Sequence, residues 1–174
     1  MPIRRNNEPL RVCEYDPAWP AQFAVLARRV HAALGDIVWR IEHIGSTAVS
    51  GLASKPVIDV DVVLTWEGHM STAVRGLSAI GYFYEGDLGV TGREAFRCPV
   101  NDPRHHLYVL SEGSIELRRH LAFRDALRAD AVLRDRYAAL KRLLATEHPH
   151  NRAAYNEGKS AFIKAAVSIE DTVR

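Results

Sequence analysis

Apolar side chains recur along the chain with two different periods, which predict different elements. After Asp16-Pro17, apolar residues are spaced three and four positions apart, which is typical of an amphipathic helix, here ending near Gly35. The stripe consists of Trp19, Phe23, Leu26, Val30 and Leu34. The following segment IVWRIEHI, residues 37–44, alternates apolar and polar side chains and predicts a half-buried strand.

The segment VIDVDVVL, residues 57–64, is rich in β-branched residues and predicts a central strand. A helical pattern over residues 67–80 follows. Three short strands are then expected at residues 81–84, 95–100 and 106–110. The turn-rich stretches GDLGVTGR and NDPR separate them.

From Ser114 onward the apolar period is helical. One run opens at Ser114, a second spans Val132 to Leu144, and Asn151 is a candidate cap for a last helix that holds Tyr155 and Val167. We therefore expect an α/β (α+β) fold, a β-sheet flanked by helices with a helical C-terminal tail. Residues 1–174 are expected to form a single domain, with an α/β front over 1–112 and the tail over 113–174.

Composition excludes some classes of protein and partner. The chain is 47% hydrophobic and 25% charged, as in average globular proteins. The absence of a long apolar run or signal segment predicts a cytoplasmic protein with no membrane partner. A net charge of +2 with no extended Lys/Arg run disfavours nucleic acid as the partner. Cys13 and Cys98 are isolated and predict neither a disulfide framework nor a zinc site.

Two aspartates inside the central strand are the first candidate for chemistry. Asp59 and Asp61 are two residues apart, so their side chains are expected on the same face. Two unpaired carboxylates among valines would repel each other and would lose hydration. A divalent cation removes both costs, and Mg²⁺ is typically held by one or two carboxylates plus phosphate oxygens. The alternative is a solvated strand end with no special role.

A Gly-Ser turn precedes that strand. Gly45 allows close approach of a ligand to the backbone, Ser46 offers a hydroxyl, and Lys55 adds a positive charge. A short helix over Thr47 to Ala53 would add free backbone N–H groups directed at a phosphate. Taken alone, the turn could be an ordinary one, but beside the aspartates it favours a phosphate site.

Together these residues resemble a known family. Gly45-Ser46 followed by Asp59-Val-Asp61 on a strand resembles the signature of the nucleotidyltransferase superfamily that includes DNA polymerase beta. The string EHIGSTAVSGLASKPVIDVDV, residues 42–62, looks like the GrpB (UPF0157) family within it. GDLGVTGR, HLAFRDALR and the segment from Tyr155 to Lys159 also look like GrpB segments. The resemblance implies a nucleotidyltransferase-like mixed sheet, and relatives of this family also occur fused to dephospho-CoA kinase.

The resemblance implies roles for individual residues. It places Gly45 and Ser46 on the phosphates of a nucleoside triphosphate, and Asp59 and Asp61 on Mg²⁺ or Mn²⁺ as the catalytic carboxylates. A third carboxylate, common in the superfamily, is missing from the matching strand HHLYVL. Many relatives look like His-Leu-His there, whereas this chain keeps His106 and has Tyr108 second. His106 is therefore a candidate metal ligand.

Further candidates each have an ordinary interpretation. Arg93, in the turn-rich loop, and Arg124 could position phosphates or form surface ion pairs. Tyr155 and Lys159 share a helical face and could stack on a base and contact a phosphate, or could be a packed tyrosine with a lysine along it. His43 shares a strand face with Gly45 and could overlook the pocket or be a plain strand histidine.

Two functions follow from these candidates. The first is nucleotidyl transfer from a bound triphosphate to an unknown small-molecule or protein acceptor. The second is a non-catalytic nucleotide-binding or accessory module, related to the domain fused to dephospho-CoA kinase. The sequence leaves the oligomeric state open, including a homo-oligomer.

Overall fold

A single mixed sheet forms the centre of the molecule. The computed structural model describes residues 9–168, and its five strands follow the order β1-β2-β5-β4-β3. β2 and β5 are parallel, and the other neighbouring pairs are antiparallel. The strands are β1 (Val38–Ile44), β2 (Ile58–Leu64), β3 (Phe83–Gly86), β4 (Arg93–Arg97) and β5 (His105–Ser111).

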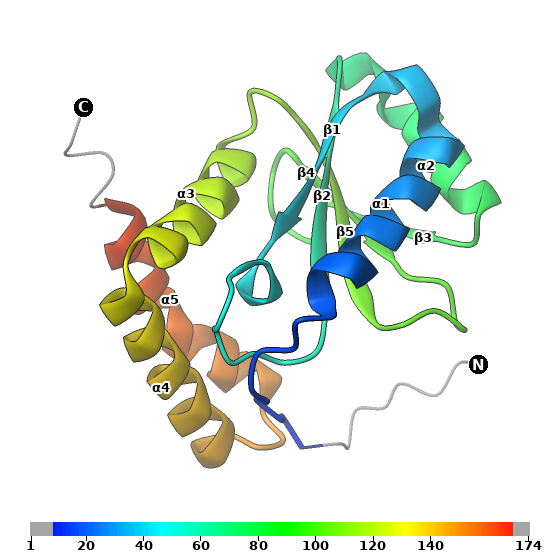
Figure 1. Cartoon of the computed structure of the whole chain (residues 1–174). Helices are drawn as coiled ribbons and strands as arrows, with labels where there is room; N and C mark the ends of the chain where they lie inside the picture. Colours follow the sequence, from blue (N-terminus) through cyan, green and yellow to red (C-terminus); the bar gives the residue numbers. More distant parts are fainter. Residues whose placement is uncertain (1–8, 169–174) are drawn as a thin grey trace.

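Helices cover both faces of this sheet. The helices α1 (Trp19–Leu34) and α2 (Met70–Ala79) lie on one side (Figure 1). The other side carries α3 (Ile115–Ala129), α4 (Ala131–Glu147) and α5 (Arg152–Ser168) (Figure 1). The expected α/β class, with a mixed sheet flanked by helices and a helical C-terminal part, is confirmed.

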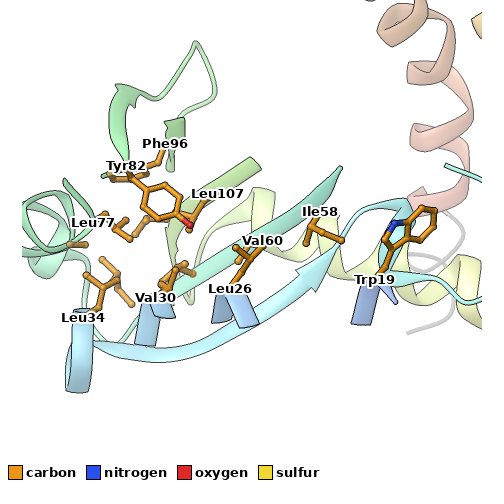
Figure 2. Close-up of a cluster of buried hydrophobic side chains, with 14 residues drawn as sticks. Trp19, Leu26, Val30, Leu34, Ile58, Val60, Leu77, Tyr82, Phe96 and Leu107 are labelled. Atoms are coloured by element: carbon orange, nitrogen blue, oxygen red, sulfur yellow. The ribbon is translucent and has the colours of Figure 1, made fainter. Parts of the chain in front are cut away.

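The main core lies between the sheet and the helices α1 and α2, and Figure 2 shows its side chains. β2 contributes its alternate residues Ile58, Val60, Val62 and Leu64 to this core, and each is at most 4% exposed. Because side chains alternate across a strand, Asp59 and Asp61 face the opposite side, toward α3, α4 and α5. Packing of α1 and α2 thus decides which face of β2 is left for polar chemistry.

A second, smaller core fixes the connection between β1 and β2. Val49 and Leu52 from this connection are buried against Leu127 of α3 and Tyr137 of α4. The connection contains a single 3-10 turn, Ser46–Ala48, after which Val49 is extended. The expected helix over Thr47 to Ala53 is therefore wrong, because Val49 and Leu52 extend into this core and Gly51 turns the chain with a φ of 76°.

The remaining local predictions differ from the structure by small shifts. The short strands begin or end one to three residues from the expected limits, and Arg93 opens β4 and does not lie in a loop. Ser114 caps α3 by accepting a hydrogen bond from the Leu117 N–H at 3.4 Å. Asn151 accepts one from the Ala154 N–H at 3.0 Å at the start of α5, as predicted. Among residues 9–168, no helix is both long and apolar enough to span a bilayer.

Candidate functional site

The two aspartates lie on β2, an interior strand next to the edge strand β1, on the face turned toward α3, α4 and α5. Strand register pairs Asp59 with Ile44 of β1 and His106 of β5, and pairs Asp61 with Glu42 and Tyr108. The Asp59 side chain is 26% exposed, whereas the Asp61 side chain is fully buried. One carboxylate is therefore open to a ligand and the other lies beneath it.

Asp61 has one satisfied and one unsatisfied oxygen. Nδ1 of His120, on α3, donates to Asp61 Oδ2 at 2.7 Å. Oδ1 of Asp61 is buried and has no hydrogen-bond partner among the described residues. Burial raises the pKa of Asp61, and the hydrogen bond from His120 opposes that rise. A buried, unpartnered carboxylate oxygen is costly in a folded protein, so this position suits a ligand such as a cation.

Asp59 touches the Gly-Ser turn. A Cβ at Gly45 would lie 2.3 Å from Asp59 Oδ2, and Gly45 has φ 70° and ψ −171°, a backbone conformation almost exclusive to glycine. On the other side, Nδ1 of His106 donates to Asp59 Oδ1 at 2.7 Å. The histidine expected beside the aspartates is thus in place, and its neighbour His105 is on the core face, bonded to Tyr82.

A lysine from the helical part reaches the turn. Nζ of Lys141, on α4, donates to Ser46 Oγ at 2.9 Å although Lys141 is only 2% exposed. Burial, together with the nearby charges of Lys159 and Lys55, lowers the pKa of Lys141 to about 7. Ser46 and Lys141 therefore join the start of the β1–β2 connection to α4.

Lys55 and Lys159 complete a cluster of three lysines with Lys141. Nζ of Lys55 lies 4.7 Å, and Nζ of Lys159 4.4 Å, from the ring centre of Tyr155. Burial is the main cause that lowers the pKa of Lys159 to about 8, and it also lowers the pKa of Lys55. Within residues 9–168, none of the three ammonium groups forms an ion pair with a carboxylate. Asp59 is the nearby anion that opposes these shifts, and a bound polyanion would stabilise the three partly dehydrated cations further.

Arg93 lies at the Asp61 end of the site. Its guanidinium lies 4.4 Å from the ring centre of Tyr108, whose pKa is raised to about 12 by burial. Nε of Arg93 is buried without a hydrogen-bond partner in the described residues. Arg93 and the lysine cluster therefore lie at different ends of the carboxylate pair.

Three other candidates make ion-pair or packing contacts within the fold. Arg124 binds Glu42 at 2.7 Å and Asp125 at 2.8 Å, and so connects α3 to β1. His43 stacks on Phe23 with ring centres 4.6 Å apart, and burial lowers its pKa to about 4. Tyr155 is 1% exposed beneath the two lysines, which favours a packed tyrosine over a base-stacking one.

Two site residues were not singled out from the sequence, Lys141 and His120. Lys141 lies four residues after Tyr137 and three before Leu144, so it occupies a core-facing position of α4, where a lysine is unusual. This core-facing position is the feature by which Lys141 could have been recognised from the sequence. His120 had no comparable signal, because its pairing with Asp61 depends on how α3 crosses the sheet.

Comparisons with known proteins identify the family and the fold of the chain. A model of the GrpB protein family matches residues 9–168. A UPF0157 protein of Halalkalibacterium halodurans is 36% identical over 165 residues, which cover 93% of this chain and 83% of that protein. The crystal structure of GrpB from Enterococcus faecalis matches with a TM-score of 0.84 and 36% identity, over 91% of this chain and 96% of that one.

More distant likenesses concern the fold or a part of the chain. The Cid1 poly(U) polymerase with MgGTP bound matches with a TM-score of 0.54 and 16% identity, over 78% of this chain and 44% of that one. A dephospho-CoA kinase of Mycolicibacterium paratuberculosis is 36% identical over 77 residues, 42% of this chain and 19% of the kinase. The polymerase likeness is one of fold alone. The chain belongs to the GrpB protein family and has a nucleotidyltransferase-like fold.

Proposed function

We propose that this protein binds a nucleoside triphosphate together with Mg²⁺ or Mn²⁺ and transfers a nucleotidyl group to a hydroxyl-bearing acceptor. The observation that carries the proposal is the adjacency of two unlike groups around the Gly-Ser turn. The carboxylate of Asp59 lies against Gly45, and the ammonium of Lys141 lies against Ser46. In a metal-bound polyphosphate, the metal ion would match the Asp59 carboxylate and the phosphate oxygens would match the Lys141 ammonium.

The phosphate side of the proposed site consists of Ser46, Lys55, Lys141 and Lys159. A triphosphate would supply the counter-ions that the three lysines lack. Charge-assisted hydrogen bonds of this kind are each worth about 1.5–3 kcal/mol. Arg93, at the Asp61 end, is the remaining cation proposed to contact the nucleotide.

Asp59 and Asp61 are the residues that would hold the metal ion. Their chemistry fits, because both are carboxylates and Oδ1 of Asp61 has no other partner. When bound, such an ion stabilises negative charge on the phosphoryl oxygens and favours the deprotonated acceptor hydroxyl. His106 and His120 hold the two carboxylates in orientation through their Nδ1 atoms, a supporting arrangement common around metal ligands. His106 is also exposed enough to serve as a ligand, as the sequence predicts.

In the proposed transfer, the acceptor oxygen forms a bond to the α-phosphorus. The bond from that phosphorus to the oxygen bridging the β-phosphorus breaks, and pyrophosphate leaves with the electron pair. The hydroxyl proton passes to water at the open side of Asp59. Ser46 and the lysines retain the leaving pyrophosphate, which keeps the reacting groups in line.

Thermal unfolding with Mg²⁺ or Mn²⁺ and a panel of nucleoside triphosphates tests binding. Ligand at about 100 times its dissociation constant should add about 2.7 kcal/mol, or roughly 5–10 °C. We expect the rise to require the metal and to be lost in Asp59→Asn and Asp61→Asn. A rise that persists in both variants would show that the nucleotide binds elsewhere. Transfer itself is measured with triphosphate labelled at the α-phosphorus.

A second function, a non-catalytic nucleotide-binding or accessory module, has an observation in its favour. Tyr108 pairs with Asp61 on the neighbouring strand, where a third carboxylate would lie. The partial likeness to a dephospho-CoA kinase fits a module that assists a partner enzyme. In that case nucleotide affinity would persist, but label from the α-phosphorus would never appear on an acceptor.

A further inference from the structure

A row of side chains crosses the sheet from the carboxylates to the far edge. Strand register pairs Asp59 with His106, His106 with Arg97, and Arg97 with Phe83. These four residues come from β2, β5, β4 and β3 in spatial order. Neighbouring strands are about 4.8 Å apart, so the backbone of Arg97 lies about 10 Å from that of Asp59.

Contacts place this row on the same face as the carboxylates. His106 is hydrogen-bonded to Asp59, and the Arg97 guanidinium lies 4.8 Å from the ring centre of Phe83. Arg93, which is four residues from Arg97 on the same regular strand, contacts Tyr108 on that face. Phe96, between them, points into the opposite core.

Arg97 is available for a ligand. Its side chain is 49% exposed, and its ion pair with Glu85, whose side chain is 36% exposed, is long, with 3.9 Å between Nε and the carboxylate, beyond hydrogen-bond distance. Phe83 is 54% exposed and supports the guanidinium from one side. A guanidinium whose face rests on an aromatic ring keeps its edge free to bind a planar or tetrahedral anion.

The row extends away from the proposed triphosphate. Gly45 and Ser46 follow β1, which adjoins β2 on the side opposite β5. Asp59 therefore lies between the Gly-Ser turn on one side and Arg97 on the other. A nucleotide bound at the turn leaves the His106, Arg97 and Phe83 side for the second substrate.

We infer that Arg97, supported by Phe83, binds an anionic group of the acceptor and so determines acceptor specificity. The acceptor is then a small hydroxyl compound that also carries a phosphate or a carboxylate. This inference rests on the proposed nucleotidyl transfer, because it places the acceptor relative to the bound triphosphate.

Binding of model acceptors tests the inference. Calorimetry would measure the affinity of the protein for glycerol 3-phosphate, glycerate and neutral glycerol. Each measurement would contain Mg²⁺ and an α,β-methylene triphosphate analogue, chosen for the nucleotide that gives the largest thermal shift. We expect at least one anion to bind at least about tenfold tighter than glycerol, and the Arg97→Gln change to remove about that factor. Arg97→Lys should retain part of it. The control Arg75→Gln removes an exposed cation of α2, across the sheet, and should change nothing.

The outcomes separate this inference from the proposed function. Comparing the affinities for glycerol 3-phosphate and glycerate shows whether the acceptor carries a phosphate or a carboxylate. If the triphosphate analogue binds but both anions bind no better than glycerol, or equally well to Arg97→Gln, Arg97 is not an acceptor site. If no triphosphate binds in the first place, the proposed function fails. If no triphosphate binds but an anion binds to the wild type and not to Arg97→Gln, the anion subsite exists without the transfer reaction.

Discussion

Lys141 of α4 donates a hydrogen bond to Ser46, 95 residues earlier in the chain, across 2.9 Å. The contact joins a cation that is buried in the helical half to the turn that precedes the central strand. A buried lysine without a carboxylate partner lowers stability, because its charged form loses hydration. A buried lysine that contacts the Gly-Ser turn is therefore a candidate for a functional role.

Replacing this lysine should therefore separate stability from binding. Lys141→Met keeps the length of the side chain and removes the buried charge, so we expect the free energy of unfolding to rise by about 1 kcal/mol or more at pH 7. Affinity for metal-bound triphosphate should fall by about tenfold or more, because one charge-assisted contact is lost. Thermal unfolding and calorimetry measure the two quantities, with Arg75→Met as the control. A variant that is less stable and binds normally would contradict the assignment.

The lowered pKa of Lys141 also predicts how stability depends on pH. The folded protein titrates this lysine at about 7, whereas the unfolded chain titrates it at its ordinary value of 10.5. Between these values the unfolded state binds more protons, so this group makes stability rise with pH. The stability difference between Lys141→Met and the wild type should therefore shrink from pH 6.5 to pH 9, as measured by urea unfolding. A difference that stays constant over this range would mean that Lys141 remains charged.

Nucleotide affinity should have the opposite pH dependence. A bound triphosphate favours the charged forms of Lys141 and Lys159, whose pKa values in the ligand-free protein are about 7 and about 8. Binding then takes up protons, and affinity falls as the pH rises above these values. Calorimetry in buffers with different ionisation enthalpies measures the uptake directly. Lys141→Met should take up fewer protons than the wild type, and equal uptake would place the titrating groups elsewhere.

The contact between Gly45 and Asp59 predicts a large effect for a single methyl group. Gly45→Ala places a Cβ 2.3 Å from Asp59 Oδ2 in a backbone conformation that costs about 1–3 kcal/mol. We expect lower stability and loss of metal-dependent nucleotide binding, because Asp59 must move. Gly89→Ala is the matched control, since Gly89 also has a positive φ, 79°, but open space around it. Gly89→Ala should be less stable but should keep metal-dependent nucleotide binding. Equally strong binding in Gly45→Ala and Gly89→Ala would contradict the role of this contact.

The support of Asp61 by His120 predicts a milder loss. His120→Ala leaves both carboxylates in place but removes the hydrogen bond to Asp61 Oδ2. Loss of a supporting partner of this kind typically lowers metal affinity by about 10–100-fold. Titration of Mn²⁺ followed by electron paramagnetic resonance measures this, with His31→Ala on the outside of α1 as the control. An unchanged Mn²⁺ affinity would mean that Asp61 needs no help from α3.

The fold could be predicted from the sequence because its main signals are local. The β-branched run in residues 57–64 and the helical stripe after Trp19 each specify an element. Sequence also pointed to His106 as the histidine beside the aspartates, and because adjacent strand residues face opposite ways, His105 lies on the core face.

The predictions that failed depend on contacts between distant segments. Thr47 to Ala53 has helix-compatible residues, but Val49 and Leu52 pack against α3 and α4, and this packing decides its conformation. Lys141 and His120 acquire their roles only when α4 and α3 cross the sheet. The core-facing position of Lys141 was a local signal, whereas the contact of His120 with Asp61 leaves no pattern near His120 itself.

Two of the three lysines of the cluster are contributed late by the chain, because Lys141 and Lys159 follow the aspartates by many residues. A ribosome that has released the whole sheet has yet to release α4 and α5, so the carboxylates and Lys55 emerge before Lys141 and Lys159. In the proposed site, polyphosphate binding would therefore depend on the last helix, and affinity would report complete folding. Proteolytic loss of α5 alone would remove Lys159 and leave the carboxylates in place.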